Sequence, residues 1–161
     1  MDEFDCATKS ISGTGTVGRL AEFGAKRLFL VVDPYFYQNG WADRVIRAAG
    51  APEAEIFHEV KPDPSVELAA EGTARLRAFG PDLIVALGGG SAMDCAKAMA
   101  YFAKTDAKVV AIPTTSGSGS EVTDFAILTH NKIKHPLVDR RPPPSDGRSN
   151  YWLPPKSLSA E

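Results

Sequence analysis

Three runs of apolar residues stand out along the chain. They are RLFLVVD at 27–33, DLIVALG at 82–88 and KVVAIP at 108–113, and each is rich in Val, Leu or Ile. Uninterrupted apolar runs of this length are typical of strands in a parallel sheet that is covered on both faces. The three runs therefore predict three buried, central strands.

Between these runs lie segments with helical periodicity. The segment 64–80 begins with Ser65, a candidate N-cap, and closes on Gly80, a residue that commonly ends helices. Alternation of strands and helices predicts an α/β fold, a Rossmann-like, doubly wound parallel sheet. The other predicted elements are helices at 40–50 and 91–104 and a short strand at 55–60.

Composition adds few constraints to this picture. Hydrophobic residues make up 43% of the 161 residues and the net charge is −2, so nothing favours nucleic acid or a membrane as a partner. The amino terminus lacks the apolar region of a signal peptide. Cys6 and Cys95 show no metal-ligand spacing, and a reduced, cytoplasmic chain is a simpler interpretation than a disulfide between them.

Two glycine clusters compete for the role of a phosphate-binding turn. GTGTVG at 13–18 has the G-x-G-x-x-G pattern, and Asp33 lies where an acid would meet a ribose, but no apolar strand precedes this cluster. ALGGGSAMDCAK at 86–97 has a strand before its glycines and a helix after them. Glycines let backbone N–H groups approach a phosphate, and the helix N-terminus favours negative charge. The second cluster is the better candidate.

A third polar stretch, AIPTTSGSGSEVTDFAILT at 111–129, also follows a predicted strand. Its hydroxyls suit a ligand at the carboxyl edge of a parallel sheet. A flexible Gly/Ser linker is the alternative, but a linker seldom joins a buried strand directly to another apolar run.

GGGSAMDCAK followed by AIPTTSGSGSEVT resembles the N-terminal nucleotide-binding domain of the iron-containing (group III) alcohol dehydrogenase family. KIKHPLVD at 132–139 is similar to the segment that follows in members acting on short-chain alcohols, and the resemblance extends from residue 7 to about residue 141. It implies an NAD-binding α/β domain over 1–141. It also implies that 142–161 is an irregular segment at the start of a C-terminal helical metal-binding domain that is absent here.

The resemblance assigns the pyrophosphate to the second glycine cluster and makes GTGTV a turn before the first helix. Asp33 would lie beside the adenosine ribose, and Asp63 close to the adenine. Asp94 would lie near the nicotinamide ribose. Lys97 and Glu121 also match motif positions, but for both a structural role is at least as well supported as a role in cofactor binding. The cofactor-binding residues implied are Asp33, Asp63, Gly89, Gly90, Ser91, Asp94, Thr114, Thr115, Ser118 and Lys134.

In this family, one Asp and three His of the C-terminal domain hold the catalytic metal, beginning a few residues beyond a PKSLSA segment. The chain ends at PKSLSAE (155–161), and His58, His130 and His135 do not match ligand positions. The resemblance therefore implies no catalytic or metal-ligating residue within the chain. Fe²⁺ or Zn²⁺ is expected only in a full-length protein, and this fragment alone is expected to be inactive.

The proline-rich segment 140–152 departs from the family pattern, where relatives usually continue with an apolar strand. Taken alone, the whole end of the chain, residues 140–161, predicts a loop or disordered tail. A compensated frameshift and a genuine divergent loop both remain open as explanations.

The activity implied by the resemblance is reversible hydride transfer between NAD(H) and a primary alcohol or aldehyde, in a cytoplasmic homo-oligomer. Two alternatives remain. One is a non-catalytic nucleotide-binding module, which a D-x-x-x-H segment beyond Glu161 would exclude. The other is a related enzyme of the glycerol dehydrogenase or dehydroquinate synthase type, against which PTTSGSGSEVT argues.

Overall fold

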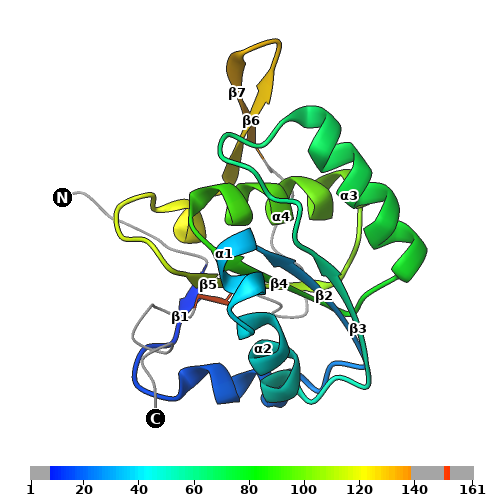
Figure 1. Ribbon diagram of the computed structural model, residues 1–161, viewed down its shortest axis with the longest axis vertical. Coiled ribbons are helices and arrows are strands. Elements are labelled where there is room, and N and C mark those ends of the chain that lie inside the picture. Colours follow the sequence, from blue (N-terminus) through cyan, green and yellow to red (C-terminus); the bar gives the residue numbers. More distant parts are fainter. Residues whose placement is uncertain (1–7, 139–150, 153–161) are drawn as a thin grey trace, which may run out of the picture.

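The computed structural model describes residues 8–138 and 151–152 of the chain. At its centre is a six-stranded parallel sheet in the order β1-β8-β5-β4-β2-β3 (Figure 1). The predicted α/β, Rossmann-like parallel sheet is confirmed. Its strands are β1 (Lys9–Ser10), β2 (Arg27–Val32), β3 (Glu53–Phe57), β4 (Leu83–Gly88), β5 (Lys108–Pro113) and β8 (Tyr151–Trp152).

Helices cover both faces of this sheet. One face packs against the 3₁₀-helix η1 (Thr16–Phe23) and α2 (Trp41–Ala49), and the other against α3 (Val66–Phe79) and α4 (Gly90–Ala103) (Figure 1). Successive strand residues point to opposite faces, so Leu28, Leu30 and Val32 join the first layer whereas Phe29 and Val31 join the second. All five are fully buried, which explains why the strand has an unbroken apolar run.

The helix ends follow the residues that predicted them. The Ser65 hydroxyl accepts a hydrogen bond from the Leu68 amide at 3.1 Å and caps α3. Gly50 and Gly80 close α2 and α3 in the left-handed conformation, with φ of 64° and 63°, where a β-carbon is unfavourable.

Two short elements depart from the expectation. Asp33 begins a five-residue helix, α1 (Pro34–Gln38), that the sequence analysis did not predict. We also expected no strand after Arg140, yet Tyr151–Trp152 forms β8 between β1 and β5. A two-residue strand is too short to leave a periodic signal, although both residues favour strands. The segments 139–150 and 153–161, together with Cys6, lie outside the described residues.

A second, antiparallel sheet consists of β6 (Phe125–His130) and β7 (Ile133–Val138). Figure 1 shows this hairpin extending past the ends of α3 and α4. The Thr129 amide donates to the Pro64 carbonyl at 2.8 Å, which ties β6 to the segment before α3. The hairpin follows a long loop that contains the 3₁₀ turn η2 (Ser120–Val122).

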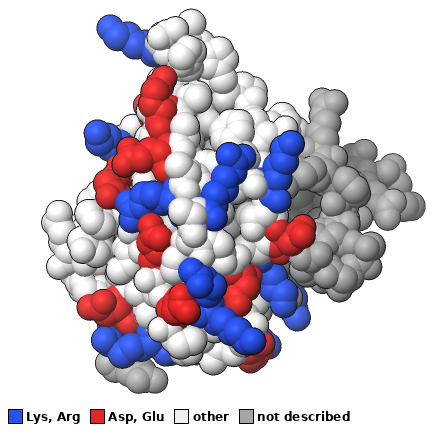
Figure 2. Space-filling model, turned by 90° about the vertical axis from the view of Figure 1, so that its right-hand side faces the viewer, with Lys and Arg blue, Asp and Glu red and all other residues white. Residues whose placement is uncertain are grey.

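Positive and negative side chains alternate on the face shown in Figure 2, so that face carries no large patch of one sign. Within the described part of the chain, no helix combines the length and apolar character that a bilayer span requires.

Candidate functional site

Three loops meet at the carboxyl edge of the central sheet, where β2, β4 and β5 end. The Asp33 amide donates to the Leu87 carbonyl, and the Thr114 amide donates to the Gly88 carbonyl, both at 2.9 Å. These bonds continue the ladder of the sheet one residue past each strand. In parallel sheets this edge is the usual place for a ligand.

The glycine turn after β4 is packed closely by its neighbours. A β-carbon added at Gly89 would lie 3.2 Å from the Thr115 hydroxyl oxygen, and one at Gly90 would lie 3.2 Å from the Ser118 β-carbon. The structure thus brings together two residues of the glycine turn and two hydroxyls of the β5–β6 loop, all of which the resemblance assigns to the cofactor. Ser118 and Thr115 are exposed at this surface.

Gly88, which the sequence analysis did not single out, has the most demanding geometry of the turn. Its φ is 150°, and an added β-carbon would lie 2.8 Å from the β-carbon of Ala92 and 2.9 Å from that of Asp33. Gly88 therefore allows the β2 and β4 loops to approach each other. The run of three glycines was the available signal, but sequence alone did not distinguish their roles.

The amino terminus of α4 faces this turn. Its N-cap is Gly89, which offers no side-chain acceptor to the first amides of the helix. Ser91 lies in the first turn and is half-buried. Unpaired N–H groups and the helix dipole make such a terminus favourable for an anion.

Asp33 occupies the end of β2 on the opposite side of the turn. Its Oδ1 accepts a hydrogen bond from the Tyr35 amide at 2.9 Å, so it also caps α1. The pair Asp33-Pro34 is a common helix start, and this signal could have revealed α1. One carboxylate oxygen is committed to the cap, and the side chain is near Gly88.

Asp94 and Lys97 lie one turn apart on α4 and contact the β5–β6 loop. The Asp94 carboxylate accepts from the Ser120 hydroxyl and, at 3.1 Å, from the Ile127 amide. The Lys97 ammonium donates to the carbonyls of Ser120 and Phe125 and lies 3.3 Å from Asp94. Burial lowers the pKa of Lys97, and the neighbouring Asp94 opposes this effect.

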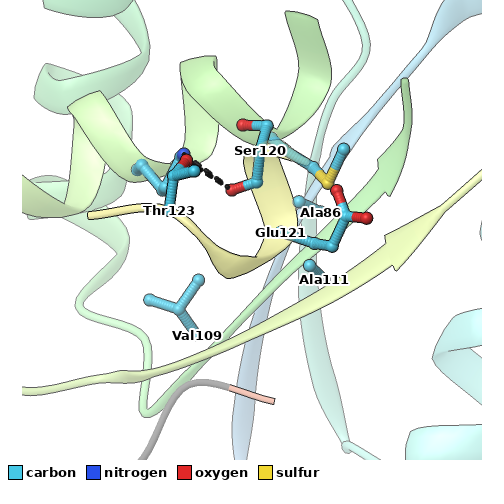
Figure 3. A pocket seen from close by; sticks show the side chains of 8 residues that line it. Ala86, Val109, Ala111, Ser120, Glu121 and Thr123 are labelled. Carbon is cyan, nitrogen blue, oxygen red and sulfur yellow. Dashed lines mark hydrogen bonds between the residues drawn. The ribbon is translucent and has the colours of Figure 1, made fainter. Parts of the chain in front are cut away.

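A small recess lies beside these residues, between η2 and the α3/α4 face of the sheet. Ser120, Glu121 and Thr123 line one side, and Ala86 and Ala111 line the other (Figure 3). It has room for about one water molecule. The Oε2 atom of Glu121 is buried there without a hydrogen-bond partner among the described residues.

Asp63 and Lys134, both predicted near the cofactor, contact each other directly. Lys134 Nζ in β7 lies 2.6 Å from Asp63 Oδ1, and both side chains are exposed. Asp63 has a φ of 53°, a left-handed conformation that Asp tolerates better than most residues. The structure therefore brings these two residues together, in a contact that does not include the glycine turn.

The three histidines have separate surroundings. His58 stacks on Tyr37 with ring centroids 4.0 Å apart, His130 lies 3.3 Å from Glu67, and His135 lies in β7. Among residues 8–138, no group of three or more His, Cys, Asp or Glu is placed to hold a metal ion. Cys95 is buried, and this burial raises the pKa of its thiol to about 12.

Comparison with known proteins relates this chain to one enzyme family. The family model described as "Iron-containing alcohol dehydrogenase" matches residues 7–145. The chain is 35% identical over 146 residues to 1-propanol dehydrogenase PduQ of Salmonella typhimurium, covering 86% of the chain and 40% of that protein. It is 35% identical over 173 residues to NADPH-dependent butanol dehydrogenase of Clostridium saccharobutylicum, covering 89% of the chain and 44% of that protein.

A solved structure shows the same fold. The sulfoacetaldehyde reductase of Bifidobacterium kashiwanohense, crystallised in complex with NAD⁺, superposes with a TM-score of 0.82 at 28% identity. The match covers 99% of the chain and 48% of the reductase. The chain thus spans less than half the length of these relatives.

Proposed function

Because the chain belongs to the iron-containing alcohol dehydrogenase family, we propose that its α/β unit binds NAD(H) at the carboxyl edge of the sheet. The unit would be the nucleotide-binding half of an enzyme that transfers hydride reversibly between NAD(H) and a primary alcohol or aldehyde. The family match and the alcohol dehydrogenases among the relatives support the reaction class. The contact between the glycine turn and the hydroxyls of Thr115 and Ser118 is the observation that carries the proposal.

The pyrophosphate is assigned to Gly89, Gly90 and Ser91. Glycines leave the backbone N–H groups of the turn uncovered by side chains of their own, and the α4 N-terminus stabilises the charge of the phosphates. Hydroxyls on Thr115 and Ser118 add neutral hydrogen-bond donors at the same place, and Thr114 continues this polar surface at the end of β5.

The adenosine ribose is assigned to Asp33, because a carboxylate accepts hydrogen bonds from ribose hydroxyls and repels a 2′-phosphate. Asp63 and Lys134 form the outer boundary of the proposed site. The bound nicotinamide would supply or accept the hydride. The residues of this chain bind the cofactor and orient it.

The catalytic metal does not fit the described residues, since no suitable group of ligands is present among them. Consequently, no step of the reaction is derived through a metal here. The contribution proposed for this chain is limited to cofactor binding and orientation.

Calorimetric titration of the 161-residue chain with NADH tests the proposal. We expect one binding site per chain and competition by ADP, which shares the adenosine pyrophosphate. Titration with NADPH measures the preference for the cofactor without a 2′-phosphate. Absence of saturable binding by NADH and ADP would contradict the proposed function.

A further inference from the structure

The β5–β6 loop, residues 114–124, carries the hydroxyls of the proposed site but has little regular structure of its own. Its only helical part is the three-residue η2, and both Gly117 and Gly119 have positive φ, at 101° and 64°. Its internal hydrogen bonds are one from the Val122 amide to the Gly119 carbonyl and two long ones of 3.4 Å, from the Ser120 amide to the Ser118 hydroxyl and from the Thr123 hydroxyl to the Ser120 carbonyl. The position of this loop therefore depends on contacts with its surroundings.

Asp94 and Lys97 supply these contacts. Together they bind both the hydroxyl and the carbonyl of Ser120, and they continue to the backbone of Phe125 and Ile127. Only 13% of the Asp94 side chain and 20% of the Lys97 side chain are exposed. The pair lies on the same helix whose N-terminus forms the glycine turn, so these contacts connect the loop to that turn through α4.

We propose that Asp94 and Lys97 are positioning residues, which hold Thr115 and Ser118 against the glycine turn. In this way they strengthen binding of the part of the dinucleotide that lies beyond its adenosine half. They act through Ser120 and the loop backbone. This inference rests on the proposed function for the identity of the ligand. It gives Asp94 a role different from direct contact with the nicotinamide ribose.

The test compares Lys97→Met and Ser120→Ala with a matched control, Arg75→Met. Lys97→Met removes the ammonium donor, and Ser120→Ala removes only the hydroxyl that binds Asp94. Arg75 in α3 is a partly buried cation with comparable contacts, to Glu55 at 2.9 Å, the Ile56 carbonyl at 2.8 Å and Glu59 at 3.2 Å, and these three partners lie outside the loop.

NADH and AMP affinities are measured calorimetrically at a temperature at which circular dichroism shows each variant to be folded. We expect Lys97→Met to weaken NADH binding about ten-fold, or about 1.4 kcal/mol, and AMP binding less than about two-fold. For Ser120→Ala we expect NADH affinity again to fall more than AMP affinity, but by a smaller factor. Arg75→Met should leave the ratio of NADH to AMP affinity unchanged. If NADH and AMP affinities fall together, or neither falls, the proposal is wrong.

Amide hydrogen exchange provides a measurement that needs no nucleotide. In Lys97→Met and Ser120→Ala, amides of 114–124 should exchange faster while those of β2 and β4 keep their protection; unchanged loop exchange would contradict the positioning role. If Lys97→Met does not fold, the affinities and the loop exchange of Ser120→Ala test the proposal instead. If the unmodified chain binds no NADH, the proposed function fails, and loop exchange still tests the positioning role separately.

Discussion

Lys134 and Asp63 form an ion pair with a 2.6 Å distance between Nζ and Oδ1, which joins β7 to the loop before α3. The two side chains are 60% and 61% exposed, so solvent screens the pair and it contributes at most about 1 kcal/mol to folding. Its importance is more electrostatic than structural, because Asp63 neutralises a cation that we assign to the outer boundary of the cofactor site.

Substitutions of the two partners should therefore change NADH affinity in opposite directions. Asp63→Asn removes the charge that neutralises Lys134 and makes the outer boundary of the site more positive, and we expect binding of the anionic cofactor to tighten by about two- to five-fold at low salt. Lys134→Met should weaken it by a similar factor. Calorimetry at low and high ionic strength measures both effects, and a change in the same direction for both variants would exclude this role for the pair.

Asp33 should determine the preference between the two nicotinamide cofactors. Asp33→Asn retains a good N-cap for α1 and removes only the charge, so stability should change by less than about 1 kcal/mol. We expect the ratio of NADPH to NADH affinity to rise about ten-fold, since repulsion of the 2′-phosphate is lost. Asp82→Asn is the control, because the Asp82 carboxylate accepts from the amides of Lys26 and Arg27 at the start of β2, the opposite end of the strand from Asp33. An unchanged ratio in Asp33→Asn would exclude the assignment.

The two glycine clusters can be separated with a matched pair of substitutions. Gly90→Ala and Gly18→Ala both place a methyl group on a helical residue with ordinary φ, but only the methyl at Gly90 is confined, 3.2 Å from Ser118. We expect Gly90→Ala to weaken NADH binding about ten-fold or more, because the methyl group would push Ser118 away from the turn that we assign to the phosphates. Gly18→Ala should bind normally. The opposite result would assign the pyrophosphate to the first cluster.

Cys95 should make the protein less stable at alkaline pH. Burial raises the pKa of its thiol from an ordinary value of 9.0 to about 12, so the fold favours the protonated form. Its contribution is complete below pH 9 and is lost as the pH rises from 9 towards 12. The difference in unfolding free energy between the unmodified chain and Cys95→Ala, measured by urea denaturation, should decrease over this interval. A difference independent of pH would contradict the raised pKa.

Much of the fold could be predicted from local patterns in the sequence. The three apolar runs became β2, β4 and β5 because each is buried by helices on both faces, and Ser65, Gly50 and Gly80 marked helix ends through local geometry. The hairpin β6–β7 and the two-residue β8 were not predicted as parts of particular sheets. Pairing between strands that are distant in the sequence produces no periodic pattern in the sequence of either strand.

The site could be predicted only as a set of loops at one edge of the sheet. The contacts of Gly89 with Thr115 and of Gly90 with Ser118 follow from the parallel strand order. The network of Asp94, Lys97 and Ser120 was missed, because a side chain bound to a distant backbone carbonyl has no sequence signature. The Asp63–Lys134 pair joins two loops that are far apart along the chain, so it also required three-dimensional information.

The position of β8 has a consequence for synthesis of the chain on the ribosome. β1 is the first strand to emerge, but its neighbour in the sheet is β8, at residues 151–152. β1 therefore has no pairing edge until residues 151–152 have been translated. Closing so long a loop carries a high entropic cost and is slow. The β2–β5 core can assemble first, and docking of β1 and β8 onto this core should follow as a later step.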